Sequence, residues 1–221
     1  MIFHTLHKEN TMNGYEIYRV CVSPLNTNCY ILKSRKTKDA LVIDPGGDYK
    51  KIKEKMDSLG ASCRVILLTH GHFDHTFAVD DMRNRLTKVA IFKDDEKMLY
   101  EHDIFTSMVD EDPRPFYPAE IIFESEGSYK IGEFEFSLIH TPGHTKGSVC
   151  YIFEDCMFTG DTLFRGSVGT TLFGGDDDEL RKSLKRLYNY PGDFTLLPGH
   201  DSPTTLSDER QSNPYMKQFA K

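Results

Sequence analysis

The sequence predicts an α/β protein built from two sheets with helices on their outer sides. Apolar, β-branched runs recur along the chain, and amphipathic segments separate some of them. Their order is strands first, then strand–helix–strand units, then strands again, and finally a helix and one more strand. This order fits two sheets with outer helices better than a pure sandwich or a doubly wound sheet. The 221 residues contain no repeat and no linker-like stretch, so we expect one domain over residues 1–221.

Nine short runs rich in β-branched and other apolar residues predict the strands. They are Glu16–Val22, Cys29–Lys33, Ala40–Ile43, Arg64–Thr69, Val89–Phe92, Phe134–His140, Ser148–Phe153, Cys156–Thr159 and Phe194–Leu197.

Three segments have helical spacing. The segment Asp48–Leu59 places Ile52, Met56 and Leu59 on one stripe and ends before Gly60, which suits a left-handed cap. The segment His75–Leu86 has looser helical spacing of its apolar residues. A third helix is expected to begin at the acidic stretch 176–178 and to carry a stripe of leucines. The stripe consists of Leu180, Leu184 and Leu187.

The segment Glu101–Pro118 ends in E-D-P-R-P-F-Y-P and predicts a helix end followed by a loop stiffened by prolines. Two interpretations stay open for it, a surface connection or a loop that covers a substrate.

Composition narrows the class of partner. The formal net charge of −7 argues against a long nucleic-acid surface, and no apolar run approaches the ~18–20 residues that span a bilayer. The stretch Met1–Asn10 lacks the apolar core of a signal peptide. The five cysteines form no C-x-x-C pair, which argues against a disulfide framework or a thiolate metal site. We therefore expect a cytoplasmic protein that acts on a small molecule, without nucleic-acid or membrane partners; the oligomeric state is left open.

The most informative stretch is T-H-G-H-F-D-H at Thr69–His75, which leaves an apolar strand and opens a helical segment. His70 and His72 flank a glycine, so a tight turn brings both imidazoles to one side. Asp74 and His75 are neighbours whose side chains must diverge, which suits a second cation beside the first.

Three further polar residues follow predicted strands, each directly after a glycine. They are His144 in T-P-G-H-T-K-G-S, Asp161 in F-T-G-D-T-L-F and His200 in L-P-G-H. Each alone is typical of a surface histidine or a turn aspartate. Together with the seven-residue motif they predict a metal site.

These motifs resemble those of the metallo-β-lactamase-fold hydrolases, and most of all the short glyoxalase II-like (hydroxyacylglutathione hydrolase-like) group. N-T-N-C-Y-I-L at Asn26–Leu32, I-D-P-G-G at Ile43–Gly47 and N-P-Y at Asn213–Tyr215 add to the resemblance, which covers roughly Val20 to Tyr215. It implies a four-layer αβ/βα sandwich with the metal site at one edge of two facing sheets.

The resemblance also implies a distribution of ligands between two divalent ions. His70, His72 and His144 would hold one ion, Asp74, His75 and His200 the other, and Asp161 would bridge both. Imidazole and carboxylate ligands without thiolate suit Zn²⁺, the expected ion, with Fe and Mn²⁺ as alternatives.

The expected reaction is attack of metal-bound hydroxide on a small acyl compound, a thioester foremost, with Asp74 and Asp161 as the catalytic carboxylates. Asp44 in I-D-P-G either orients a ligand imidazole or is simply a turn residue.

Three residues near the expected ligands are candidates for substrate contact. Lys146 and Arg165 could pair with a substrate carboxylate, or they are surface cations. The related enzymes usually continue after G-D-T-L-F with Ser/Cys-x-Gly and then Arg or Lys, whereas this chain has Thr170 in the basic position. The missing cation, and the lack of a long helical segment after His200, argue against strong glutathione recognition.

Other activities of this fold stay open. A sulfur (persulfide) dioxygenase would use one iron held by two histidines and a carboxylate, and a lactonase or phosphodiesterase would use both ions. A nuclease would need an added nucleic-acid domain and a basic surface, and a non-enzymatic binding module would be expected to have lost ligands.

Overall fold

The computed structural model describes residues 14–101 and 117–220. The segment Glu101–Pro118, expected to be either a surface connection or a loop that covers a substrate, therefore lies almost wholly outside the described residues. The chain divides into two compact units. The described part of the N-terminal unit comprises residues 14–68, 72–91, 97–101 and 117–122, and that of the C-terminal unit comprises 69–71, 92–96 and 123–220. The single domain expected over residues 1–221 stays a prediction.

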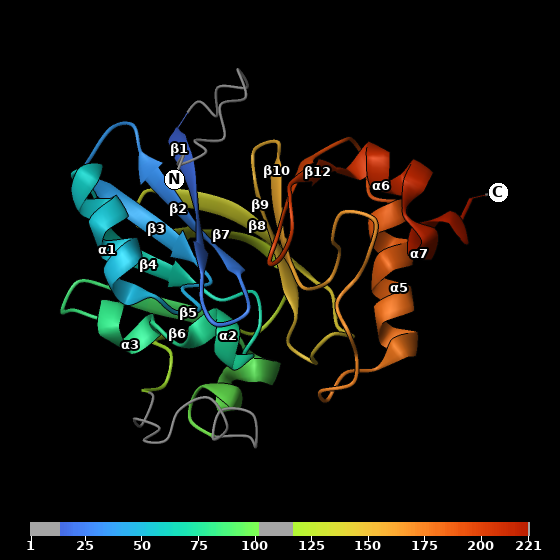
Figure 1. Ribbon diagram of the computed structural model, residues 1–221, viewed down its shortest axis with the longest axis horizontal. Helices are drawn as coiled ribbons and strands as arrows, with labels where there is room; N and C mark the ends of the chain where they lie inside the picture. The colour runs from blue at the N-terminus through green and yellow to red at the C-terminus, as the bar shows by residue number, and fades with distance from the viewer. Residues whose placement is uncertain (1–13, 102–116, 221) are drawn as a thin grey trace. The chain divides into compact units, whose positions relative to one another are not determined.

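A six-stranded sheet in the order β1-β2-β3-β4-β5-β6 forms the frame of the N-terminal unit (Figure 1). Its first pairs, β1–β2 and β2–β3, are antiparallel, whereas β3–β4 and β4–β5 are parallel. The strands are β1 (Tyr15–Val22), β2 (Thr27–Ser34), β3 (Asp39–Ile43), β4 (Ser62–Leu67), β5 (Lys88–Phe92) and β6 (Ile121–Phe123). The parallel pairs need crossover connections, which α1 (Tyr49–Ser58) provides between β3 and β4, and α2 (Phe73–Thr76) with α3 (Val79–Met82) between β4 and β5.

Alternation along the strands of this unit separates two apolar faces. Ile31 and Ile66 pack in one buried cluster with Ile52 of α1, whereas the strand neighbours Leu32 and Leu67 belong to the other face and are also fully buried. Strands with both faces buried appear in the sequence as continuous apolar runs. That is why the strands were predictable from sequence here.

The single helix expected over His75–Leu86 is wrong, because the structure has two short helices, α2 and α3. The Ala78 N–H donates to the Pro45 carbonyl at 2.9 Å instead of to the carbonyl four residues earlier, which belongs to Asp74. The Asp74 carbonyl packs against Gly46, where a Cβ would come within 1.5 Å of its oxygen. The turn at 44–47 thus interrupts the helix directly after the expected ligands Asp74 and His75.

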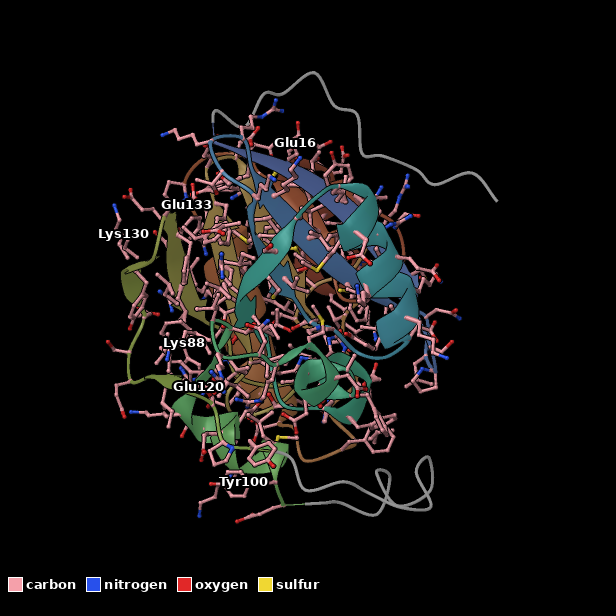
Figure 2. All side chains as sticks on the ribbon, turned by 90° about the vertical axis from the view of Figure 1, so that its left-hand side faces the viewer. Glu16, Lys88, Tyr100, Glu120, Lys130 and Glu133 are labelled. Carbon is pink, nitrogen blue, oxygen red and sulfur yellow. The ribbon has the colours of Figure 1, made fainter. Side chains whose placement is uncertain are left out.

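Polar side chains hold the segment before β6 against β5, near the edge of this sheet. Glu120 (Figure 2) accepts a hydrogen bond on its carboxylate from the Val89 N–H of β5 at 2.8 Å. The same carboxylate binds the Arg83 guanidinium. Arg83 also donates to the carbonyls of Tyr117 and Pro118. These bonds fix the start of β6 against β5.

A second six-stranded sheet, in the order β12-β11-β10-β9-β8-β7, forms the frame of the C-terminal unit (Figure 1). In this sheet β10 and β11 pair in parallel, whereas β7–β8, β8–β9, β9–β10 and β11–β12 are antiparallel. The strands are β7 (Gly127–Ile131), β8 (Phe134–His140), β9 (Val149–Phe153), β10 (Cys156–Gly160), β11 (Thr195–Pro198) and β12 (Thr204–Thr205). The short or polar strands β6, β7 and β12 were not predicted, because they lack the apolar runs on which the prediction rested.

The helices of the C-terminal unit are α5 (Asp177–Tyr188), α6 (Leu206–Ser212) and α7 (Pro214–Lys217). The helix expected from the acidic stretch at 176–178 is confirmed as α5, with the Asp176 side chain accepting the Glu179 N–H at 2.9 Å. Leu180, Leu184 and Leu187 pack with strand residues in the buried cluster of this unit.

Two further features bear on function. Within residues 14–101 and 117–220, no helix combines the length and apolar character needed to cross a membrane. All five cysteines have free thiols, and all except Cys21 are buried.

Candidate metal centre

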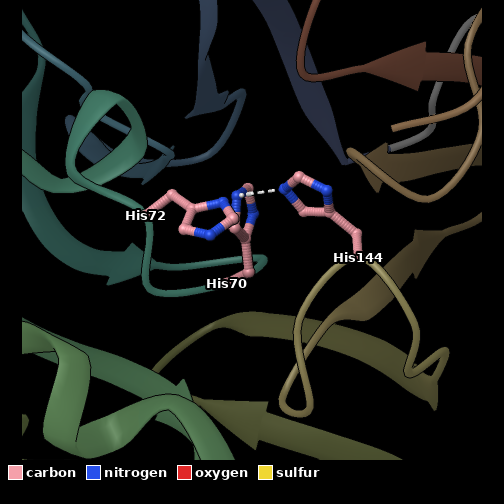
Figure 3. Close-up of side chains that lie close together, drawn as sticks. All are labelled: His70, His72 and His144. Carbon is pink, nitrogen blue, oxygen red and sulfur yellow. Dashed lines mark hydrogen bonds between the residues drawn. The ribbon is translucent and has the colours of Figure 1, made fainter. Parts of the chain in front are cut away.

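Four of the seven expected ligands lie in the C-terminal unit and converge there. The Nε2 atoms of His70 and His144 are 3.2 Å apart (Figure 3). The Asp161 Oδ2 atom lies 3.6 Å from the His144 Nε2 and 3.5 Å from the Nε2 of His200. The structure therefore brings together four side chains that are separated by up to 130 positions in the sequence.

Backbone contacts at the strand ends hold these residues in place. The Thr69 carbonyl accepts the Val149 N–H at the start of β9, at 2.9 Å, which fixes the segment that carries His70. Gly160 has φ +48°, and a Cβ there would come within 2.4 Å of the Thr69 Oγ1. Its carbonyl accepts the Gly199 N–H at 2.8 Å, so the residues that precede Asp161 and His200 are bonded to each other. Position 160 therefore requires glycine both for its conformation and for this close approach.

The ring orientation of His144 is fixed by a backbone partner. Its Nδ1 lies 2.6 Å from the Thr170 carbonyl, which can only accept a hydrogen bond. Nδ1 must therefore carry the proton, and in the neutral ring Nε2 keeps its lone pair. This is the tautomer that a metal ligand needs, and it is set by a main-chain atom.

The N-terminal unit holds the other three expected ligands, His72, Asp74 and His75. The His75 Nδ1 lies 2.9 Å from the Oδ2 of Asp44, and both side chains are buried. A carboxylate oxygen accepts here, so His75 also presents Nε2 as a lone pair. The Asp74 Oδ2 accepts a hydrogen bond from the Thr27 hydroxyl at 2.9 Å. His72 precedes α2 and is half-buried.

The contact between Asp44 and His75 bears on both interpretations of I-D-P-G. Asp44 has φ +50° and so does occupy a turn, but its carboxylate orients an imidazole as well. Both descriptions therefore apply to the same residue.

The donor chemistry of both units fits divalent metal ions. Each unit supplies imidazole and carboxylate groups at buried or half-buried positions. In His75 and His144, Nε2 keeps the lone pair with which it could bind a metal ion. Neutral imidazole with carboxylate is the ligand set of zinc, iron and manganese sites. The division of the seven residues between two ions stays a prediction.

The three candidate substrate residues are all exposed in the C-terminal unit. Lys146 lies on the loop of His144, and its carbonyl accepts from the His140 Nε2 at 2.8 Å. Arg165 lies in the turn that the Phe164–Ser167 bridge closes. The Thr170 carbonyl binds His144, and its hydroxyl accepts the Leu172 N–H at 3.2 Å. A contact of any of these side chains with substrate stays a prediction.

Two residues at the site were missed from the sequence. Thr27 lies inside the N-T-N-C motif, but nothing in that motif indicated its bond to Asp74. Asp95 is buried on the 3-10 helix η1 (Lys93–Leu99) and contacts the loops of His70 and His144. It stands in K-D-D-E among other acidic residues, so no sequence signal distinguishes it from its neighbours.

Residues 22–200 match the family model described as "Metallo-beta-lactamase superfamily". The chain belongs to the metallo-beta-lactamase superfamily. The α/β fold predicted from the motifs, with two mixed sheets and helices, is thereby confirmed as the metallo-β-lactamase fold.

Two relatives match the chain over nearly their whole length. A "Probable metallo-hydrolase YqgX" of Bacillus subtilis is 33% identical over 208 residues, which cover 91% of this chain and 98% of that protein. The "Hydroxyacylglutathione hydrolase GloC" of Haemophilus influenzae is 33% identical over 207 residues, covering 88% of this chain and 95% of the relative. The chain is thus a metallo-hydrolase of this superfamily.

Solved structures agree with this membership. The crystal structure of the BLEG-1 B3 metallo-beta-lactamase has a TM-score of 0.83 and 34% identity, covering 90% of this chain and 99% of its own. The structure of TTHA1623 in a di-iron-bound form has a TM-score of 0.76 and 33% identity, with the same coverages. The superfamily fold binds divalent metals, and these neighbours leave the identity of the metal open.

Proposed function

We propose that this protein is a dinuclear metal-dependent hydrolase that cleaves a small acyl compound, with thioesters as the preferred class. The observation that carries the proposal is the tautomer of His75 and His144. Each ring donates its Nδ1–H to a fixed oxygen, which leaves the Nε2 lone pair available to a metal ion. Buried imidazoles held in this tautomer are typical of metal ligands. The glyoxalase II-like motifs and the hydroxyacylglutathione hydrolase among the relatives support the thioester class.

We assign the seven residues to two ions as the motifs imply. The first ion takes His70, His72 and His144, and Asp161 is shared. The second takes Asp74, His75 and His200. The contacts of the Asp161 Oδ2 with both His144 and His200 support its bridging role. Zinc is the expected ion, and the di-iron form of TTHA1623 makes iron the first alternative.

Two bound divalent ions would supply Lewis acidity and lower the pKa of a bound water to about 7. The residues of this chain hold that chemistry in place. Asp44 keeps the His75 proton on Nδ1, and the Thr170 carbonyl does the same for His144. Asp74 and Asp161 add negative charge, which limits the net positive charge of the centre to a level that favours an anionic transition state over a neutral substrate.

Two buried cysteines, Cys29 and Cys150, are unsuited to act as nucleophiles. Burial raises the pKa of the Cys150 thiol to about 11, and burial also raises the pKa of Cys29 well above its ordinary value. Since the thiolate is the reactive form, neither group is prepared for covalent catalysis at neutral pH. Five free thiols support the expectation of a reducing, cytoplasmic compartment.

For the substrate, we infer a small acyl compound other than a glutathione thioester. Thr170 supplies no cation where related short enzymes carry Arg or Lys. Lys146 and Arg165 are exposed and close in sequence to expected ligands, so they are the candidates for pairing with a substrate carboxylate.

One experiment tests the proposal. Purified protein is analysed for metal content and then assayed with acyl thioesters, lactones, phosphodiesters and a β-lactam. We expect two metal ions per chain and the highest kcat/KM with a thioester. A single iron per chain together with oxygen uptake on a persulfide would instead assign the protein as a sulfur dioxygenase. Faster cleavage of a lactone or a phosphodiester would retain the metal centre but overturn the thioester class.

A further inference from the structure

Asp95 is a buried carboxylate that lies between the two loops carrying His70 and His144. Its Oδ2 accepts hydrogen bonds from the Gly71 N–H at 3.0 Å and from the Thr145 hydroxyl at 2.6 Å. Its Oδ1 accepts the Gly147 N–H at 2.7 Å. The residue is 1% exposed, and all of these partners belong to the C-terminal unit.

The surroundings of Asp95 are shaped to receive a carboxylate. A Cβ at position 147 would lie 2.6 Å from the Asp95 Cγ, so only glycine lets the loop approach so closely. The Thr145 hydroxyl also contacts the Ser148 hydroxyl at 2.7 Å, and Ser148 accepts the Thr145 N–H at 3.0 Å. The carboxylate and the His144 loop therefore form one connected hydrogen-bond network.

Two of the donors to Asp95 directly follow expected metal ligands in the chain, since Gly71 follows His70 and Thr145 follows His144. A rotation of either loop would lengthen a charge-assisted hydrogen bond to the same carboxylate. The single buried side chain thus couples the positions of two imidazoles whose Nε2 atoms are 3.2 Å apart.

We propose that Asp95 is a positioning residue that fixes the separation of His70 and His144 so that both can bind one metal ion. This inference rests on the proposed metal centre. Asp95 acts without touching the metal or the substrate, because its oxygens are occupied by the two loops. An asparagine cannot replace it, because its NH₂ group would face a backbone N–H donor in either orientation of the amide, that of Gly71 or that of Gly147.

Asp94→Asn provides the matched control for Asp95→Asn. Asp94 lies on the same 3-10 helix and is exposed. The two substitutions remove the same charge from adjacent positions, so an effect of net charge or of the helix itself would occur in both. Thr145→Val is a third variant of nearly unchanged shape, which removes only one of the three donors.

The test is a titration of the metal-free variants with Co²⁺, followed by its visible absorption and by competition with a chelator. We expect Asp95→Asn to weaken the binding of one of two Co²⁺ ions about 10- to 100-fold and to change the spectrum of that ion. Thr145→Val should weaken the same ion by a smaller factor, and Asp94→Asn should match the unsubstituted protein. Thermal unfolding of the metal-free variants measures the purely structural contribution separately.

The outcomes separate the two proposals. If the unsubstituted protein binds no Co²⁺, the proposed metal centre fails. If it binds two ions and folded Asp95→Asn binds both as Asp94→Asn does, only the role of Asp95 is overturned. Equal weakening of the binding of both ions in Asp95→Asn would also overturn it, because Asp95 contacts only the loops of His70 and His144, which are assigned to one ion. If Asp95→Asn does not fold, Thr145→Val decides, and its unchanged affinity for both ions would contradict the proposal.

Discussion

The two units orient a histidine in the same way with different partners. In the N-terminal unit, the His75 Nδ1 lies 2.9 Å from the Asp44 carboxylate, whereas in the C-terminal unit the His144 Nδ1 lies 2.6 Å from the Thr170 carbonyl. A carboxylate adds negative charge and makes the ring a stronger donor, whereas a carbonyl fixes only the tautomer and the orientation. The Asp44 carboxylate can therefore be removed by a substitution, whereas the Thr170 carbonyl belongs to the backbone and stays whatever side chain occupies position 170.

The largest effect is expected where the C-terminal unit brings its ligands together. Asp161→Ala removes the carboxylate beside His144 and His200 and, with it, the proposed bridge. We expect kcat/KM for a thioester to fall by about a thousandfold or more, since the ions contribute several kcal/mol to transition-state stabilisation. Circular dichroism should show an intact fold, and the exposed Asp178→Ala serves as the control. Near-normal turnover of Asp161→Ala would contradict the dinuclear mechanism.

Replacement of the carboxylate partner in the N-terminal unit should have a smaller effect. Asp44→Asn keeps the shape of the side chain, and asparagine also tolerates the φ of +50° at this position. It removes the negative charge beside His75, so metal affinity and activity should each fall about 10- to 100-fold. Asp39→Asn is the matched control, because Asp39 is partly exposed and begins β3, the strand that directly precedes Asp44. Equal metal affinity in both variants would mean that the charge of Asp44 is unimportant.

In the C-terminal unit, a substitution of Thr170 leaves the orienting carbonyl in place and tests the side chain alone. Thr170→Arg should lower KM for lactoylglutathione about ten- to a hundredfold, because a charge-assisted contact contributes roughly 1.5–3 kcal/mol. The turnover number should change little, since this binding is remote from the reacting bond. Thr170→Gln controls for length without charge. Saturation of the unsubstituted protein at micromolar lactoylglutathione would show the inference from Thr170 to be wrong.

The smallest effect is expected for the buried thiols, which belong to neither orienting pair. Cys150→Ser and Cys29→Ser should retain turnover close to that of the unsubstituted protein. The rate should rise with pH through an apparent pKa near ~7, as expected for a metal-activated water, and not near the value of about 11 to which burial raises the pKa of Cys150. Inactive serine variants that still contain their metals would point to covalent catalysis.

The clustering of the expected ligands was predictable because strand ends and glycines mark these residues in the sequence. His144, Asp161 and His200 each follow an apolar run and a glycine, and the C-terminal unit does bring all three together with His70. The role of Asp44 was also within reach, since its motif offered an orienting carboxylate as one of two interpretations.

Contacts that depend on loop geometry were not predictable. Thr170 was considered for its side chain, whereas the structure uses its carbonyl, and a carbonyl is present at every position of the sequence. The helix at 75–86 failed for a related reason, because the Pro45 carbonyl takes the N–H of Ala78 across the fold. The periodicity of apolar residues indicates which side of a helix is buried. It cannot indicate that a distant turn supplies a competing hydrogen-bond acceptor.

The short stretches 69–71 and 92–96 belong to the C-terminal unit, although the chain on either side of each belongs to the N-terminal unit. A gene fragment that encodes residues 123–221 would therefore contain all six strands of the second sheet but neither His70 nor Asp95. Fragment complementation with a cut after Ile122 would have to restore both stretches from the other polypeptide. The C-terminal unit thus cannot be transferred to another protein as one continuous gene segment. Recombination between homologous genes would preserve its contacts only when the stretches 69–71 and 92–96 match the segment from residue 123 onward.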